Sequence, residues 1–130
     1  MTATRLNPQP VVLFDDDAKA LSGAVTLAET AANFSRLVIC YRSNDGDYGS
    51  AEVWHPDGKT VSLLAARTAG GNTVNVYLKS KTVLISGTKI DTVSYQSSGT
   101  RWATSQVRVE GSNAATQGDY IAITQVIGYR

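Results

Sequence analysis

Hydrophobic and polar residues alternate with a period of two over short stretches of this 130-residue chain. Such alternation is typical of β-strands that cover a core with one face. Clusters of glycine, serine, asparagine and aspartate separate the stretches and favour turns. The pattern predicts about eight or nine short strands and no long helix. It indicates an all-β protein, an antiparallel β-sandwich of jelly-roll-like character, with a flattened barrel as the alternative because it has the same strand pattern.

The strongest strand pattern lies between residues 34 and 59. Leu37–Tyr41 are consecutive apolar residues, which predicts a strand with both faces covered. A polar turn cluster follows at 43–47, and then an amphipathic run, Ala51–Trp54, that ends before Pro56. We therefore expect a hairpin here, with polar and aromatic side chains close to its loops.

The remaining strands are predicted from shorter or weaker patterns. They are Val11–Phe14, Ala24–Ala28, Thr60–Arg67, Thr73–Lys79, Val83–Ile85, Ile90–Val93, Arg101–Val109 and Tyr120–Ile127. Within 73–79, the alternation predicts that Val76 and Leu78 face the core while Tyr77 and Lys79 face outward.

The last predicted strand is rich in isoleucine, with Ile121, Ile123 and Ile127 expected on one side. Burying each such side chain contributes roughly 1.5–3 kcal/mol, so we expect this strand to lie inside a sheet. Residues 1–10 carry two of the three prolines and should form an extended lead-in. Residues 11–130 should form one domain.

Charge and composition narrow the classes of partner. The net charge is +1, from 12 basic and 11 acidic residues that form no blocks. A nucleic-acid partner would require a basic cluster, so none is expected. Nothing resembles a signal peptide, and no run approaches the roughly 20 apolar residues of a membrane span. The single cysteine, Cys40, excludes an intrachain disulfide and should be a small buried hydrophobe.

A series of short motifs follows this pattern from about Leu21 to Arg130. They are Ala32-Asn33-Phe34-Ser35, Trp54-His55-Pro56-Asp57-Gly58-Lys59, Val76-Tyr77-Leu78-Lys79-Ser80-Lys81, Ile85-Ser86-Gly87-Thr88-Lys89-Ile90 and the final strand through Tyr129. In this order they resemble the C-terminal head domain of tail fibre, baseplate and receptor-binding proteins of tailed phages and prophages. The resemblance implies an all-β homotrimer of the virion tail, made in the host cytoplasm. Its partners would be bacterial surface saccharides or other tail proteins.

Candidate ligand-binding residues lie around the predicted central hairpin: Asp45, Asp47, Tyr48, Trp54 and His55. An outward Trp54 beside a loop would offer a platform for a sugar ring, which Tyr48 could extend. Alternatively, Trp54 packs at a subunit interface or under a loop. The two aspartates are explained by a turn, and the glutamate that a calcium loop requires is missing. We expect no metal and no cofactor.

Further aromatic residues are expected on the surface, and we predict that they meet another subunit. Trp102 alternates with buried positions, Tyr77 lies on the polar side of its strand, and Tyr129 belongs to the final motif. Several outward aromatic side chains on one small domain are explained more simply by oligomerisation than by separate sites.

The sequence contains one histidine, so a histidine-based catalytic site would depend on His55 alone. We therefore predict a non-enzymatic, receptor-binding protein. Two alternatives stay open: a structural virion subunit that binds only other phage proteins, as in a baseplate or capsid decoration, and a carbohydrate-binding module.

Overall fold

The computed structural model describes residues 9–70, 74–93, 96–97, 100–101, 106–110 and 116–130. It confirms the predicted all-β class: twelve strands are found in these ranges, more than expected because several are only two residues long. The strands are β1 (Val11–Asp15), β2 (Val25–Thr26), β3 (Arg36–Ser43), β4 (Tyr48–Trp54), β5 (Thr60–Gly70), β6 (Val74–Ser86), β7 (Lys89–Thr92), β8 (Gln96–Ser97), β9 (Thr100–Arg101), β10 (Gln106–Glu110), β11 (Thr116–Gln117) and β12 (Ile121–Tyr129).

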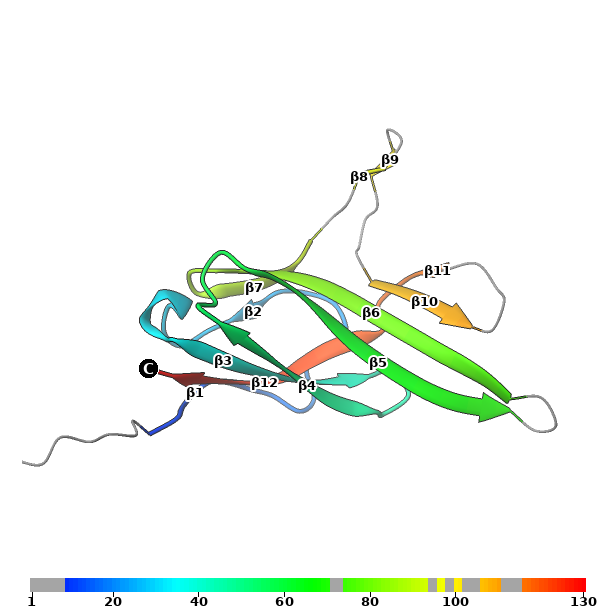
Figure 1. The fold of residues 1–130 in the computed structure, drawn as a ribbon, viewed down its shortest axis with the longest axis horizontal. Helices are drawn as coiled ribbons and strands as arrows, with labels where there is room; N and C mark the ends of the chain where they lie inside the picture. Colours follow the sequence, from blue (N-terminus) through cyan, green and yellow to red (C-terminus); the bar gives the residue numbers. More distant parts are fainter. Residues whose placement is uncertain (1–8, 71–73, 94–95, 98–99, 102–105, 111–115) are drawn as a thin grey trace, which may run out of the picture.

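Two antiparallel sheets form the sandwich (Figure 1). The four-stranded sheet has the order β1-β12-β3-β4. The six-stranded sheet has the order β11-β10-β6-β7-β2, with β5 paired along the other edge of β6. The β5–β6 hairpin extends past the end of the four-stranded sheet (Figure 1). A short 3-10 turn, η1 (Ala31–Asn33), precedes β3, and among the described residues no helix is long and apolar enough to cross a membrane.

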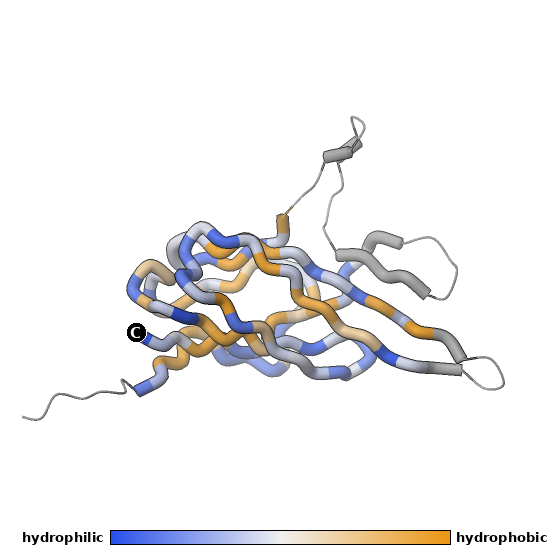
Figure 2. The backbone as a smooth tube through the Cα atoms, in the orientation of Figure 1, coloured by the Kyte–Doolittle hydropathy of each residue, from blue (hydrophilic) through white to orange (hydrophobic). Residues whose placement is uncertain are grey.

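One hydrophobic core lies between the two sheets (Figure 2). Its most completely buried large side chains come from both sheets: Leu37 and Ile39 of β3, Leu63 of β5, Val83 and Ile85 of β6, Ile90 of β7, and Ile121 and Val126 of β12. At roughly 1.5–3 kcal/mol for each buried side chain, this shared core is what holds the sheets together.

The isoleucine-rich strand β12 lies inside its sheet, between β1 and β3, as the sequence predicts. The prediction that Ile127 shares a side with Ile121 and Ile123 is wrong. The pairing with β3 shifts between Ile123 and Gln125, so Thr124 is an extra residue and Val126 faces the core instead. A bulge of this kind changes which residues after it face inward.

The prediction that β3 is covered on both faces is also wrong. Burial alternates along the strand, with Leu37 and Ile39 fully buried but Val38 and Cys40 only half-buried. Each sheet of a sandwich packs on the other with one face and turns its second face outward. A continuous apolar run therefore does not require two covered faces.

The largest correction concerns β6, where the predicted inward and outward residues are exchanged. Val76 and Leu78 are exposed, while Lys79 is buried and Tyr77, on the same side, is half-buried. The reason is that β6 continues without a break to Ile85, which is fully buried. A strand with a strict period of two then places the odd-numbered residues from Tyr77 to Ile85 on the inner side.

Candidate functional site

The predicted central hairpin is formed by β3 and β4. Their register pairs Arg42 with Tyr48 near the turn and Arg36 with Trp54 at the far end. Tyr48 and Trp54 are thus on the same outer face but at opposite ends of β4, about 20 Å apart at 3.3 Å per residue. One saccharide ring cannot stack on both, so the structure does not bring them into a single platform.

The two aspartates of the turn are bound by cations from the other sheet. Arg67 contacts the Asp47 carboxylate through Nε at 2.9 Å and Nη2 at 3.0 Å. The Lys79 ammonium pairs with the Asp45 carboxylate and donates to Asn44 Oδ1 at 2.5 Å. The hydrogen bond to Asp47 raises the pKa of Arg67. These carboxylates tie the turn to β5 and β6, and within the described ranges no group of three or more acidic, histidine or cysteine residues could hold a metal ion.

Tyr48 has a similar structural contact. Its hydroxyl donates to Asp17 Oδ1 at 3.0 Å, and this hydrogen bond raises the pKa of Tyr48. The ring itself is exposed. Tyr48 therefore helps to hold the acidic segment after β1, and its hydroxyl is already engaged within the chain.

Trp54 lies in a row of stacked side chains that we call the Trp54 row: Trp54, Arg36 and Tyr129. The Arg36 guanidinium carbon is 5.4 Å from the centre of the Trp54 ring and 4.0 Å from that of Tyr129. The register places these residues side by side on β4, β3 and β12. Glu52 Oε2 lies 3.6 Å from Arg36 Nη1. Trp54 is 57% exposed. Cation–π contacts at exposed sites contribute about 0.5–1 kcal/mol each, so Arg36 restrains the ring without covering it.

His55, next to Trp54, has an unusual backbone. Its φ is 49°, the one positive value at a non-glycine residue among those the structure describes. Its N–H donates to Ser35 O at 2.8 Å, which holds this conformation. A non-glycine residue in this region costs of order 1–3 kcal/mol. The exposed side chain borders a small hollow of about 220 Å³, lined also by Ala31, Ala32, Phe34, Pro56 and Asp57.

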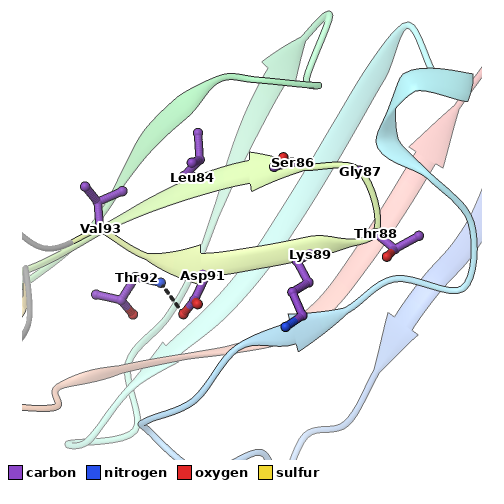
Figure 3. A pocket seen from close by; sticks show the side chains of 8 residues that line it. All are labelled: Leu84, Ser86, Gly87, Thr88, Lys89, Asp91, Thr92 and Val93. Carbon is purple, nitrogen blue, oxygen red and sulfur yellow. Dashed lines mark hydrogen bonds between the residues drawn. The ribbon is translucent and has the colours of Figure 1, made fainter.

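A larger hollow, of about 680 Å³, lies along the β6–β7 hairpin (Figure 3). Its apolar wall consists of Leu84 and Val93, and its polar groups come from Ser86, Thr88, Lys89, Asp91 and Thr92. The volume lies in the range of small-molecule sites, but no aromatic ring lines it. From the sequence, only a turn between the predicted strands Val83–Ile85 and Ile90–Val93 was expected here. The turn is formed at Gly87, whose φ of 59° lies in the left-handed region that glycine adopts most readily.

The predicted interface residues do not form one surface. Tyr129 belongs to the Trp54 row, and Tyr77 lies on the inner side of β6, contrary to the outward placement expected from the sequence. Trp102 lies outside the described residues. Sequence reasoning missed Arg36, although a hairpin centred on Asp45 necessarily pairs position 36 with position 54.

No protein-family model, curated protein or solved structure significantly matches this chain. The resemblance to phage tail head domains therefore stays a prediction.

Proposed function

We propose that this chain is a non-enzymatic receptor-binding subunit of a phage or prophage tail, and that it holds a saccharide of the bacterial surface on Trp54. The observation that carries the proposal is the Trp54 row: a largely exposed indole ring at the end of a paired hairpin, oriented by Arg36. A side chain that is already ordered loses less conformational freedom when a ligand binds.

The surroundings of Trp54 suit a polyhydroxylated ligand. The indole offers an apolar face to the C–H groups of a sugar ring. Arg36 and Glu52 supply a hydrogen-bond donor and an acceptor on the same outer face. The hollow of about 220 Å³ beside His55 has room for a small group of the ligand. This favours a short saccharide epitope over an extended apolar ligand.

The test compares two exposed aromatic residues on one strand. We expect Trp54→Ala to weaken binding to glycan arrays and to host cells at least tenfold, with unchanged circular dichroism. Tyr48→Ala is the matched control, because Tyr48 shares the face of Trp54 but lies about 20 Å away. Equal loss in both variants would contradict a site at Trp54.

His55 provides a second variant that separates binding from folding. His55→Gly relieves the positive φ, so the melting temperature should stay the same or rise. If the imidazole contacts the saccharide, affinity should nevertheless fall several-fold in the same array measurement. A variant that binds as the parent does would remove His55 from the site.

A second candidate function is a structural virion subunit that recognises only other phage proteins. The uncharged, partly apolar outer surface of β5 and β6 favours it, because such surfaces mark protein contacts. Copurification with virion proteins, together with no binding of the parent protein to glycans or cells, would favour this role over receptor binding.

A further inference from the structure

The outer face of the β5–β6 hairpin is uncharged. It consists of alternate residues from Thr60 to Thr68 on β5 and from Val76 to Leu84 on β6, which the register brings into cross-strand pairs. All of these positions hold serine, threonine, alanine, valine or leucine. We call this surface the β5–β6 face.

Large apolar side chains are concentrated there. Four of the seven large hydrophobic residues found exposed in the described part of the chain lie on it: Leu64 at 53%, Val76 at 58%, Leu78 at 43% and Leu84 at 40%. Leu64, Leu78 and Val76 are neighbours in the register, whereas Leu84 lies farther along β6. Single exposed hydrophobic residues are normal, but a contiguous group of this kind usually marks a contact with another protein. The β5–β6 face is therefore unlike the rest of the described surface.

The inner side of the same strand makes the contrast sharper. Lys79 and Lys81 are both 3% exposed and occupy positions that face the interior. Lys81 donates to Ile121 O at 3.1 Å, and its burial lowers its pKa. Between residues 76 and 81 of β6 the charged side chains point inward and the large aliphatic side chains point outward. This is the reverse of the usual arrangement, in which the apolar side of a strand packs on the core of its own chain. An apolar surface outside the monomer would account for this order.

The chemistry of the β5–β6 face limits the classes of partner that it could bind. Without a cation it does not suit nucleic acid, and without an aromatic ring it offers no platform for a sugar. Two copies of an uncharged face meet without like-charge repulsion and without burying an ion. The outer face of the four-stranded sheet, with Arg36, Arg42 and Glu52, is not self-complementary in this way.

The size of the face sets the strength of such a contact. β5 has 11 residues, and at about 3.3 Å per residue and 4.8 Å between strands the two strands cover about 350 Å². That area is below the ~800 Å² per partner of a standard interface, so the contact would be a weak one that forms only at higher protein concentrations. The hairpin extends past the four-stranded sheet (Figure 1). Its outward residues are exposed except Ser80, which is half-buried, and Thr82, which is buried.

We propose that the β5–β6 face packs against the β5–β6 face of a second copy of this chain. The inference does not depend on saccharide binding, because the Trp54 row lies on the other sheet. Stacked sheets pack about 10 Å apart, so Leu64 and Leu78, near the middle of the face, would be buried between copies.

Size-exclusion chromatography with light scattering, on the full chain over a range of micromolar concentrations, tests this assembly. We expect an oligomer for the parent protein and a monomer for the double variant Leu64→Asp/Leu78→Asp. The matched control is Val12→Asp, at a residue 54% exposed on the other sheet, which should leave the oligomer intact. Circular dichroism and melting temperature show whether each variant is folded.

A second measurement decides the question if the double variant does not fold. Ser80→Cys in a Cys40→Ala background puts one thiol near the middle of the face, and mild oxidation should give a disulfide-linked pair of chains. Four outcomes would each overturn the proposal. The parent protein could be monomeric at every concentration, or the double aspartate variant could still form the oligomer. The introduced thiol could fail to cross-link, or the chain could bind solely to a different protein or to lipid vesicles.

Discussion

The two outward surfaces of this sandwich differ in chemistry although both are faces of antiparallel sheets. The four-stranded sheet presents arginine, glutamate and the exposed rings of Trp54 and Tyr48. The β5–β6 face presents only aliphatic and hydroxyl side chains. Folding constrains one face of each sheet, because the core needs only that face. The residue composition of the other face is not constrained by the core and can suit a partner. Here the outward faces of the two sheets differ in composition.

Two neighbouring leucines on β5 test the difference between the inner and outer faces most directly. Leu63 is fully buried, whereas Leu64 is exposed. We expect Leu63→Ala to lower the free energy of unfolding by about 3 kcal/mol through the lost burial and the cavity. Leu64→Ala should change it by less than about 0.5 kcal/mol in dilute monomer, yet weaken self-association. Urea unfolding at low concentration measures both values, and similar losses would mean that the two faces do not differ.

The buried lysines are tolerated because the acidic turn of the opposite sheet pairs with one of them. Asp45→Asn removes the charge that faces Lys79, whose side chain is 4% exposed. The expected loss of stability is about 2 kcal/mol, since a buried cation is left without its counter-ion.

Two further variants sharpen this prediction. Adding Lys79→Met to Asp45→Asn should recover much of the loss, whereas Asp91→Asn, at an exposed residue, should cost little. Thermal unfolding would contradict the prediction if the double variant were less stable than Asp45→Asn alone.

The smallest expected effect is a change in melting temperature at acidic pH. Two hydrogen bonds from Arg130, at 2.7 and 2.9 Å, hold the pKa of Glu29 below its usual 4.5. A carboxyl whose folded pKa is depressed stabilises the protein above its unfolded pKa, and this contribution is lost as the pH falls through the folded value. The melting temperature of the parent should therefore approach that of Glu29→Gln between pH 5 and pH 3.

Self-association through the β5–β6 face can be compared with this pH-dependent change in stability. The β5–β6 face holds no titratable group, so self-association should be constant over the same pH range while the protein stays folded. A melting-temperature difference that is independent of pH would show that the Glu29–Arg130 pair contributes nothing through its charge.

The parts of the fold that could be predicted from the sequence are those determined by local chemistry. The β3–β4 hairpin follows from its turn cluster, and the β6–β7 turn from Gly87. The orientation of β6 was not predicted, because the pattern was divided near Ser80 into two strands. The buried Val83 and Ile85 belong to the same uninterrupted strand, and they set the side of every residue before them.

The candidate site was predicted in part. An outward Trp54 follows from alternation along β4 and is observed. The roles of Asp45 and Asp47 were not predicted, since their partners Lys79 and Arg67 come from a different sheet. Contacts between sheets depend on how the sheets stack, and a one-dimensional pattern carries little information about that.

The bulge at Thr124 has a consequence for how this chain can vary in length. Tyr41 pairs with Ile123, and the next residue on β3, Cys40, pairs with Gln125, so Thr124 has no counterpart. Loss of that one codon would restore an unbroken ladder and leave every other side chain of β12 on its present side. Removal of a residue elsewhere in β12 would exchange inside for outside over part of the strand. Among related genes, we therefore expect single-residue gaps in this strand to cluster at Thr124.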